Sequence, residues 1–362
     1  MIPPRALRRL ILAPLVAAIG LGLVVLSPLL GVLTVIFRML GMARPGKLRL
    51  VRLLWLVLIW SGGETAALVT CLGLWIASGF GGRLRTEPYR ERHYALMRWF
   101  LDLVYRAAER ACGLEVLISE PELDAPECAA RLARPVIVLS RHSGPGDSLL
   151  LVRHMLSKYR RRPRVVMKAA LQLDPSVDVV ANRLPNVFVS SRGARGPHTE
   201  QISRLAAGLD DKDALVIFPE GGNWTPHRWQ RAIRRLQQQG RKDLADRAIS
   251  MPNLLAPRPG GALAAIAACP VADVIFVAHA GLDQLVSLRD MWRHLPTGVT
   301  VRARWWRVPA WEVPRQAERE TQVAWLYDWW ERIDAWISQT NAAQPQGRKI
   351  SEAAARLPDI ST

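Results

Sequence analysis

The sequence of 362 residues contains few cysteines and lacks the short motifs of several enzyme classes. Its cysteines show no paired spacing; they are Cys71, Cys112, Cys128 and Cys269. This pattern argues against disulfide bridges and against a zinc site, so we expect no metal and a reducing environment. There is no His-Glu-x-x-His pair, no Gly-x-Ser-x-Gly turn and no Gly-Lys-Ser/Thr loop. Metalloprotease, serine hydrolase and nucleotide hydrolase interpretations therefore lose support.

Carboxylates are scarce as well. The chain has 31 Asp and Glu residues against 49 Lys and Arg residues, which gives a net charge of +18. Nucleic acid is one anionic partner for such a chain, but no zinc finger, helix-turn-helix or aromatic RNA-binding signature is present. Many of the basic residues flank two long apolar segments, and each one near an anionic membrane adds about 1 kcal/mol of attraction. We therefore expect anionic membrane lipids as partners and no nucleic acid.

A basic stretch, residues 227–236, has the pattern of an amphipathic helix. Trp229, Ile233 and Leu236 fall on one side at helical spacing, and arginines surround them. The pattern is typical of a helix in a membrane interface, and equally of a solvated helix packed by three apolar residues. The tryptophans of residues 322–337 also recur at near-helical spacing, and there we favour packing in a core over a membrane-facing stripe.

Two apolar segments near the N-terminus are long enough to enter a membrane. Residues 10–37 carry no charge, and residues 53–80 carry a single one, Glu64. Each segment exceeds the ~20 residues of a spanning helix and the ~15 residues of a signal-peptide core. We therefore predict that residues 1–92 form a retained membrane anchor and that the protein is located at a membrane.

All three flanks of these segments are basic. The positive-inside rule would place every flank in the cytoplasm, which two simple spans cannot achieve. Breaks at Ser27-Pro28 and at residues 61–64 would let each segment dip into one leaflet and return. The alternative is a two-span hairpin with its loop on the other side. We favour the dipping arrangement because Glu64 at mid-segment is costly in lipid, and we expect the remaining domain on the cytoplasmic face.

After the anchor, short β-rich runs alternate with stretches long enough for helices. The runs are residues 136–139, 165–167, 187–189, 215–218 and 274–277, with 299–308 as a candidate late strand. This alternation predicts an α/β fold, a sheet flanked by helices. We assign residues 93–338 to this domain. Residues 339–362 are small and polar, and we predict a loose tail there.

Two polar clusters follow predicted strands, where open α/β sheets bind ligands. In the first, His142 and Asp147 lie five positions apart across a glycine-rich bend. One interpretation is a helix N-cap at Asp147 beside an ordinary loop histidine. The other is a general base: an imidazole with an unperturbed pKa of about 6.5 accepts a proton while the carboxylate fixes its tautomer. The second cluster, residues 216–226, contains one isolated carboxylate, Glu220, with either a chemical or a structural task.

In combination, these clusters resemble the motifs of the glycerolipid acyltransferases, which include the 1-acylglycerol-3-phosphate acyltransferases. His142 and Asp147 match the family's His-x4-Asp block, and Phe218-Pro219-Glu220-Gly221 matches its Phe-Pro-Glu-Gly block. Looser matches are residues 187–192 and residues 254–261. The resemblance covers residues 136–278 and implies a glycerol-3-phosphate acyltransferase-like core with a mixed sheet flanked by helices.

The resemblance implies transfer of a fatty acyl group from an acyl thioester to the free hydroxyl of a lysophospholipid. The first expectation for the acceptor is 1-acylglycerol-3-phosphate, which would give phosphatidic acid. His142 would be the general base, oriented by Asp147. The expected substrate-binding residues are Arg192, Glu220 and Gly221. Lys168 and Arg258 are weaker candidates for binding carrier or acceptor phosphates; Lys168 is a candidate only by its place at a strand end, where an ordinary surface lysine is the favoured alternative. The donor would be acyl-coenzyme A or an acylated carrier protein, and no cofactor is implied.

The sequence departs from the family pattern at three places. Gly144 and Gly222 stand where the family often has serine and threonine, and Ser190-Ser191 stands where an acidic residue is more usual. These differences leave open another lysolipid or a glycolipid as acceptor. A non-catalytic anionic-lipid-binding protein of the same fold is the further alternative.

Overall fold

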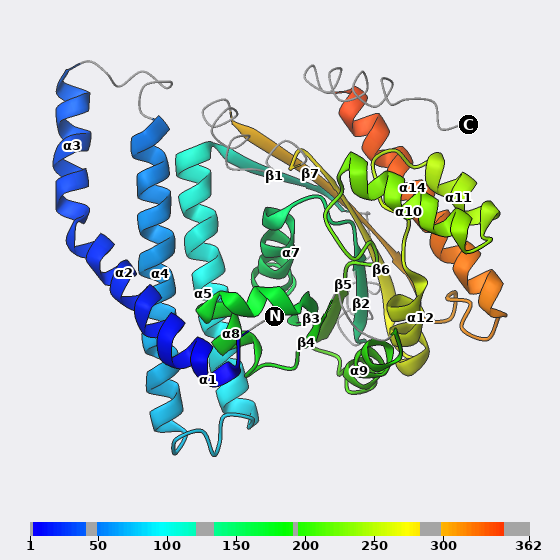
Figure 1. Cartoon of the computed structure of the whole chain (residues 1–362), viewed down its shortest axis with the longest axis horizontal. Coiled ribbons are helices and arrows are strands. Elements are labelled where there is room, and N and C mark those ends of the chain that lie inside the picture. Colours follow the sequence, from blue (N-terminus) through cyan, green and yellow to red (C-terminus); the bar gives the residue numbers. More distant parts are fainter. Residues whose placement is uncertain (1–2, 41–48, 121–133, 191–194, 283–297, 344–362) are drawn as a thin grey trace.

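The structure, a computed structural model, describes residues 3–40, 49–120, 134–190, 195–282 and 298–343 (Figure 1). Within these ranges, seven strands form one sheet in the order β1-β7-β6-β2-β5-β3-β4. The strands are β1 Leu114–Ser119, β2 Val136–Ser140, β3 Arg162–Lys168, β4 Val187–Val189, β5 Asp213–Ile217, β6 Asp273–Ala280 and β7 Val299–Val308. Neighbouring strands pair in parallel, except that β6 and β7 are antiparallel. The predicted α/β fold with a mixed sheet is confirmed.

Helices cover both faces of the sheet. Successive residues of β2 point to opposite faces, so that Ile137 and Leu139 join one core while Val136 and Val138 join the other. The first face is covered by α9 (Arg195–Ala207), α10 (Pro226–Gln238), α11 (Lys242–Ile249), α12 (Pro259–Ala268) and α14 (Arg319–Ala342). The second is covered by α7 (Pro145–Ser157), against which α5 (Glu87–Cys112) packs.

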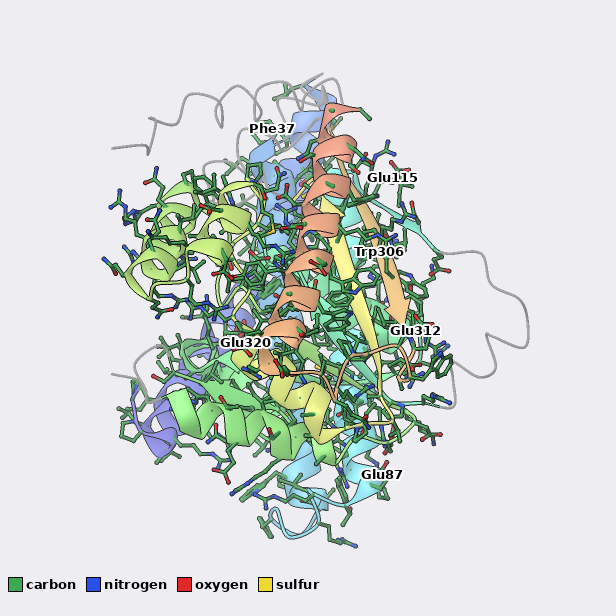
Figure 2. All side chains as sticks on the ribbon, turned by 90° about the vertical axis from the view of Figure 1, so that its right-hand side faces the viewer. Phe37, Glu87, Glu115, Trp306, Glu312 and Glu320 are labelled. Atoms are coloured by element: carbon green, nitrogen blue, oxygen red, sulfur yellow. The ribbon has the colours of Figure 1, made fainter. Side chains whose placement is uncertain are left out.

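The apolar sides of α10 and α14 both face the first core. In α10 the three apolar side chains at helical spacing are buried, namely Trp229, Ile233 and Leu236. The structure therefore supports the interpretation of α10 as a solvated helix. In α14 Trp330 is fully buried, and Trp329 contacts Trp306 of β7; Figure 2 shows α14 alongside β6 and β7. The predicted core packing of this helix is confirmed. The tail predicted for residues 339–362 is wrong in its first four residues, which belong to α14, and residues 344–362 lie outside the described residues.

Two N-terminal helical stretches are long and apolar enough to cross a membrane, and they suggest membrane association. They are Arg5–Val25 and Leu50–Ala77. Their elements are α1 (Arg5–Leu7), η1 (Arg8–Leu12), α2 (Ala13–Val25) and α4 (Arg49–Ala77), with α3 (Ser27–Met39) between α2 and α4. The first segment is interrupted at Leu26, close to the predicted break. The second runs unbroken through residues 61–64, so the break predicted there is wrong.

This N-terminal region is attached to the α/β domain. α2 packs along α4, and α4 packs along α5 (Figure 1). Between β3 and β4 lie η2 (Ala169–Leu173) and α8 (Pro175–Ala181), and the fully buried Asp178 of α8 binds the guanidinium groups of Arg8 at 2.7 Å and Arg9 at 2.9 Å. The N-terminal helical segment thus begins on the surface of the domain that carries the polar clusters.

Candidate active site

The first cluster lies at the carboxyl end of β2, where the chain bends into α7. Asp147 is the third residue of α7, and its Oδ2 accepts the backbone N–H groups of Ser143 at 2.7 Å and Gly144 at 3.0 Å. Its Oδ1 accepts the hydroxyl of Ser148 at 3.0 Å. Gly144 is the N-cap residue of α7, so its bond satisfies one of the N–H groups that the start of a helix leaves without an intrahelical partner. Asp147 therefore closes the start of α7 and also fixes the bend that carries His142.

His142 faces the carboxylate of Asp147, and these two residues are called the dyad below. Its Nδ1 lies 3.0 Å from Oδ1 and 3.1 Å from Oδ2 of Asp147, and its ring packs 4.7 Å from the ring of Phe218. An ionised carboxylate only accepts hydrogen bonds, so Nδ1 carries the proton and Nε2 is the acceptor left for a substrate. Burial opposes the charge of Asp147, but His142, His279 and the Gly144 N–H outweigh it and lower the pKa of Asp147 to about 2.

Glu220 connects the second cluster to the first. It follows β5 and is buried; Oε1 accepts the backbone N–H of His142 at 2.9 Å, and Oε2 accepts that of Leu255 at 3.1 Å. In return, the Trp224 N–H donates to the His142 carbonyl at 3.0 Å. Burial raises the pKa of Glu220 to about 8, against the two N–H donors and the charge of Arg141. Its carboxylate thus holds the backbone of the site, and direct contact with substrate stays a prediction.

Arg141 directly precedes His142 in the chain and is almost fully buried. Its backbone N–H donates to Val277 of β6 at 3.2 Å, and its guanidinium donates to the carbonyls of His279 and Asn253. The side chain therefore joins the ends of β2 and β6 to the segment before α12. It also supplies a positive charge near Glu220, which offsets part of the cost of burying that carboxylate.

Three cationic side chains surround the glycine pair after Glu220. Gly221 has φ of +69°, and a Cβ there would lie 3.1 Å from the guanidinium of Arg258. A Cβ at Gly222 would lie 3.4 Å from an Arg228 nitrogen and 3.5 Å from Lys168 Nζ. Burial, followed by the charges of Arg228 and Arg258, lowers the pKa of Lys168. Three positive charges at one turn form a ready site for an anion.

The cationic cluster comes from three separate elements. Lys168 ends β3, Arg228 lies in the first turn of α10, and Arg258 is the N-cap residue of α12. Arg258 is fixed by its own N–H, which donates to the Pro219 carbonyl at 2.9 Å. Arg228 bonds the Asn223 carbonyl at 3.1 Å.

Most of the predicted site residues meet at this edge of the sheet. His142, Asp147, Glu220 and Gly221 form one connected group, and Lys168 and Arg258 border it. Arg192 lies outside the described residues.

The sequence interpretation missed three residues of the site: Arg141, Arg228 and His279. Arg228 was not singled out because it lies in a stretch, residues 227–236, that contains several other arginines. A lone histidine within the apolar run of β6 was the available signal for His279.

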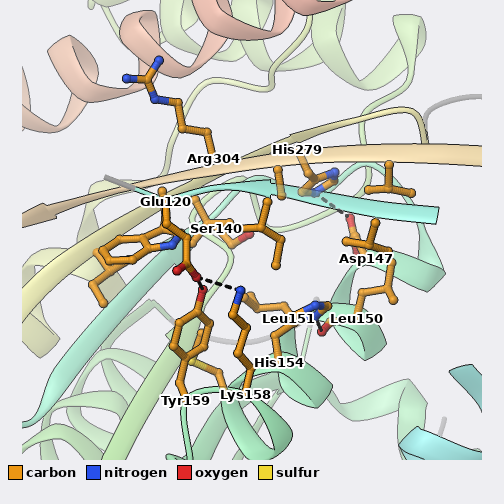
Figure 3. A pocket seen from close by; sticks show the side chains of 18 of the residues that line it. Glu120, Ser140, Asp147, Leu150, Leu151, His154, Lys158, Tyr159, His279 and Arg304 are labelled. Atoms are coloured by element: carbon orange, nitrogen blue, oxygen red, sulfur yellow. Dashed lines mark hydrogen bonds and ion pairs between the residues drawn. The ribbon is translucent and has the colours of Figure 1, made fainter. Parts of the chain in front are cut away.

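An apolar cavity of about 560 Å³ lies between α7 and the sheet, behind Asp147 (Figure 3). Aliphatic side chains such as Leu151 of α7 and Val277 of β6 form its walls. Asp147 and His279 line one end. At the other, Glu120 accepts the Tyr159 hydroxyl at 2.7 Å and pairs with Lys158 at 2.9 Å. The volume falls in the range of about 300–1,000 Å³ that is usual for small-molecule sites.

Comparison with known proteins identifies a domain in this region. Residues 122–280 match the family model described as Acyltransferase, and the match includes both polar clusters and the cationic turn. It supports an enzyme that transfers acyl groups. No curated protein and no solved structure matches the chain. Within the described residues, no three His, Cys, Asp or Glu side chains are grouped so as to hold a metal ion.

Proposed function

We propose that the protein is a membrane-bound O-acyltransferase that transfers a fatty acyl group from an acyl thioester to the free hydroxyl of a lysophospholipid. The proposed principal acceptor is 1-acylglycerol-3-phosphate, which would yield phosphatidic acid. The observation that carries the proposal is the contact of His142 Nδ1 with Asp147 at 3.0 Å, together with the three cationic side chains at the Gly221-Gly222 turn, which Glu220 connects to the His142 backbone.

The proposed reaction needs one proton acceptor. Nε2 of His142 takes the proton from the acceptor hydroxyl, and the oxygen attacks the thioester carbonyl carbon. Asp147 stabilises the imidazolium that forms. The C–S bond of the tetrahedral intermediate then breaks, and the leaving thiolate takes the proton back from His142. The products are an ester and a free thiol, so the reaction balances with the two substrates alone and the proposal includes no cofactor.

The cationic cluster supplies the proposed phosphate site. Lys168, Arg228 and Arg258 converge on the Gly221-Gly222 turn, and the glycines leave the space between them open. Guanidinium groups bind phosphate by paired, charge-assisted hydrogen bonds. A phosphate held here would keep the acceptor next to His142, because the same turn is bonded to the His142 backbone through Glu220 and Trp224. Arg192 stays a further candidate on the strength of its motif.

The apolar cavity is the proposed site for an acyl chain. Its walls are aliphatic, and Asp147 belongs to both the cavity and the dyad. Burial of a methylene group contributes about 0.8 kcal/mol, so a chain of many methylenes gains substantial binding energy there. The exposed apolar faces of α2, α3 and α4 would hold the enzyme at an anionic membrane, with the catalytic domain on the cytoplasmic side.

A second acceptor class is supported by the glycine at position 222. Gly222 is buried and lacks the side chain that the family often has there, and a Cβ at this position would make ordinary contacts with Arg228 and Lys168. The missing threonine side chain would favour an acceptor such as another lysolipid or a phosphorylated glycolipid. A non-catalytic lipid-binding role is disfavoured, because the contact of His142 with Asp147, the bonds of Glu220 to the site backbone and the three cations at the Gly221-Gly222 turn are all present.

The test is transfer of a labelled acyl group from acyl-coenzyme A to lysophosphatidic acid by the full chain in vesicles. We expect labelled phosphatidic acid, and its loss in His142→Ala. His227→Ala removes an exposed histidine of α10 and is the matched control. If no product forms, the same assay with acyl carrier protein donors and other lysolipids follows. Absence of transfer with every donor and acceptor would contradict the proposal.

The phosphate site has its own test. Arg228→Ala removes a cation of the cluster, and we expect a higher KM for phosphate-bearing acceptors with a smaller effect on kcat. Arg234→Ala removes an exposed arginine from the same helix, away from the cluster, and serves as control. If both substitutions raise KM equally, the loss of affinity comes from the lower positive charge of the protein as a whole and not from a phosphate site.

A further inference from the structure

A second histidine reaches the carboxylate of the dyad. His279 is the penultimate residue of β6, and its Nε2 lies 3.5 Å from Oδ2 of Asp147 (Figure 3). His142 contacts the same carboxylate at 3.0 Å through Oδ1. Both oxygens of Asp147 therefore face an imidazole. The side chain of His279 is only 8% exposed, and that of Asp147 only 1%, so solvent does not screen this contact.

The backbone around His279 keeps it at this distance. β6 pairs in parallel with β2 up to Ser140, and the Arg141 N–H continues the ladder to Val277 at 3.2 Å. The guanidinium of Arg141 binds the His279 carbonyl, and His279 Nε2 lies 3.3 Å from the Arg141 carbonyl. The ring is thus held against the bend that carries His142, while Asp147 is held by the first turn of α7.

We infer that His279 is a positioning residue that acts through Asp147: by sharing the carboxylate, it reduces the proton affinity of His142 and keeps the base neutral at lower pH. The inference rests on the proposed function, in which neutral His142 accepts the proton. The lowered pKa of Asp147 agrees with it, because His279 is among the groups that outweigh burial there.

The direction of the effect is the same for both protonation states of His279. As a neutral ring with a proton on Nε2, it directs a positive N–H dipole at the carboxylate; as a cation, it places a full charge there. Either state weakens the attraction between Asp147 and a protonated His142. Among the other charged and titratable groups, Arg141 binds the His279 carbonyl, and His154 of α7 and Arg304 of β7 line the same cavity.

The experiment follows the ring of His142 directly. The full chain, labelled in its histidine rings with ¹⁵N, is titrated in detergent micelles by NMR as wild type, His279→Leu and His279→Gln. We expect the midpoint of the His142 titration to rise by about half a pH unit or more in His279→Leu. A smaller rise is expected in His279→Gln, because the amide still offers a hydrogen-bond donor. The acidic limb of kcat/KM for acyl transfer moves by the same amount.

His154→Leu is the matched control for charge and cavity shape. His154 lines the same cavity from α7, but its Nδ1 bonds the Leu150 carbonyl at 2.7 Å, away from Asp147. We expect His154→Leu to leave the midpoint of the His142 titration unchanged. A folded His279→Leu with an unchanged or lowered midpoint overturns the inference, whatever its activity. If His279→Leu does not fold, His279→Gln decides in the same way. Lack of transfer by the wild type overturns only the proposed function, since the NMR titration needs no turnover.

Discussion

The backbone N–H of His142 donates to the buried carboxylate of Glu220 at 2.9 Å, and the two residues come from loops 78 positions apart in the chain. The second oxygen of Glu220 accepts the Leu255 N–H at 3.1 Å, so one carboxylate fixes three loops at the edge of the sheet. Glu220 therefore acts on the proposed base through the backbone, and we expect its substitution to change where the His142 ring lies.

Glu220→Gln keeps the size of the side chain but removes one acceptor. Each oxygen of the Glu220 carboxyl group accepts one N–H, whereas the amide nitrogen of glutamine cannot accept and meets one of these N–H groups with its own donor. We expect a loss of about 1–3 kcal/mol in the free energy of unfolding, measured by urea denaturation. We also expect transfer activity to fall more than the folded fraction does, because the His142 bend loosens. Glu318→Gln, at the exposed N-cap of α14, is the control. Wild-type stability in Glu220→Gln would contradict the bracing role.

Asp147 links the dyad to stability in acid. Its pKa is lowered from 3.8 to about 2, so the folded state favours the ionised form. This contribution is fully present above about pH 4 and is lost as the pH falls toward 2. The shift corresponds to about 2 kcal/mol. Asp147→Asn should therefore be less stable than wild type at pH 6, and the difference, measured by urea denaturation, should shrink as the pH falls from about 4 toward 2.

The same substitution separates stability from catalysis. The neutral amide introduced by Asp147→Asn cannot stabilise an imidazolium, and we expect kcat to fall on the order of 10³–10⁴-fold. Asp102→Asn breaks the partly exposed ion pair with Arg153 and should cost no more than about 1 kcal/mol. If Asp147→Asn is destabilised equally at pH 6 and pH 3, the lost stability does not come from the ionised carboxylate of Asp147.

Neighbouring glycines at the cationic turn should respond differently to alanine. Gly221 has φ of +69°, and an added Cβ would lie 3.1 Å from the Arg258 guanidinium, so Gly221→Ala should cost about 1–2 kcal/mol of stability. Gly222 has no such conformation, and its Cβ would make ordinary contacts with Arg228 and Lys168. Gly222→Ala should fold normally but raise KM for phosphate-bearing acceptors, because the methyl group enters the proposed phosphate site. Unchanged KM for every acceptor would move that site elsewhere.

Much of the sheet could be predicted from local sequence, because parallel strands buried on both faces are continuous apolar runs. The runs at 136–139 and 274–277 mark β2 and β6. β1 was missed because it lies at the edge of the sheet; its residues alternate between partly buried and exposed, and Glu115 interrupts its apolar pattern. The uninterrupted α4 was also missed, since Gly62 and Gly63 signal a break that packing against α5 prevents.

For the site, the sequence was sufficient where the contact is local and insufficient where it depends on strand order. His142 and Asp147 lie five positions apart, so their contact is local; the spacing left a helix N-cap and a general-base pair open, and the resemblance favoured the pair. The contact of Glu220 with the His142 backbone requires that β5 lie beside β2, and the contact of His279 requires that β6 lie on the other side. Neither neighbour follows from the pattern of apolar residues. The same reason explains why Arg228 could not be separated from the other arginines of α10.

The cavity behind Asp147 should set which acyl chains are used. Leu151 lines it from α7, whereas Leu149 of the same helix is exposed. Leu151→Trp would fill part of the aliphatic space, and we expect kcat/KM for long-chain donors to fall at least about tenfold, a change of about 1.4 kcal/mol in transition-state binding. For short-chain donors kcat/KM should fall much less, because a short acyl chain does not reach the part of the cavity that the tryptophan fills. Leu149→Trp adds the same side chain outside the cavity and should leave the chain-length profile unchanged. A uniform loss over all chain lengths in Leu151→Trp would mean that the acyl group binds elsewhere, and the exposed apolar faces of α2 and α4 would then be the next surface to probe.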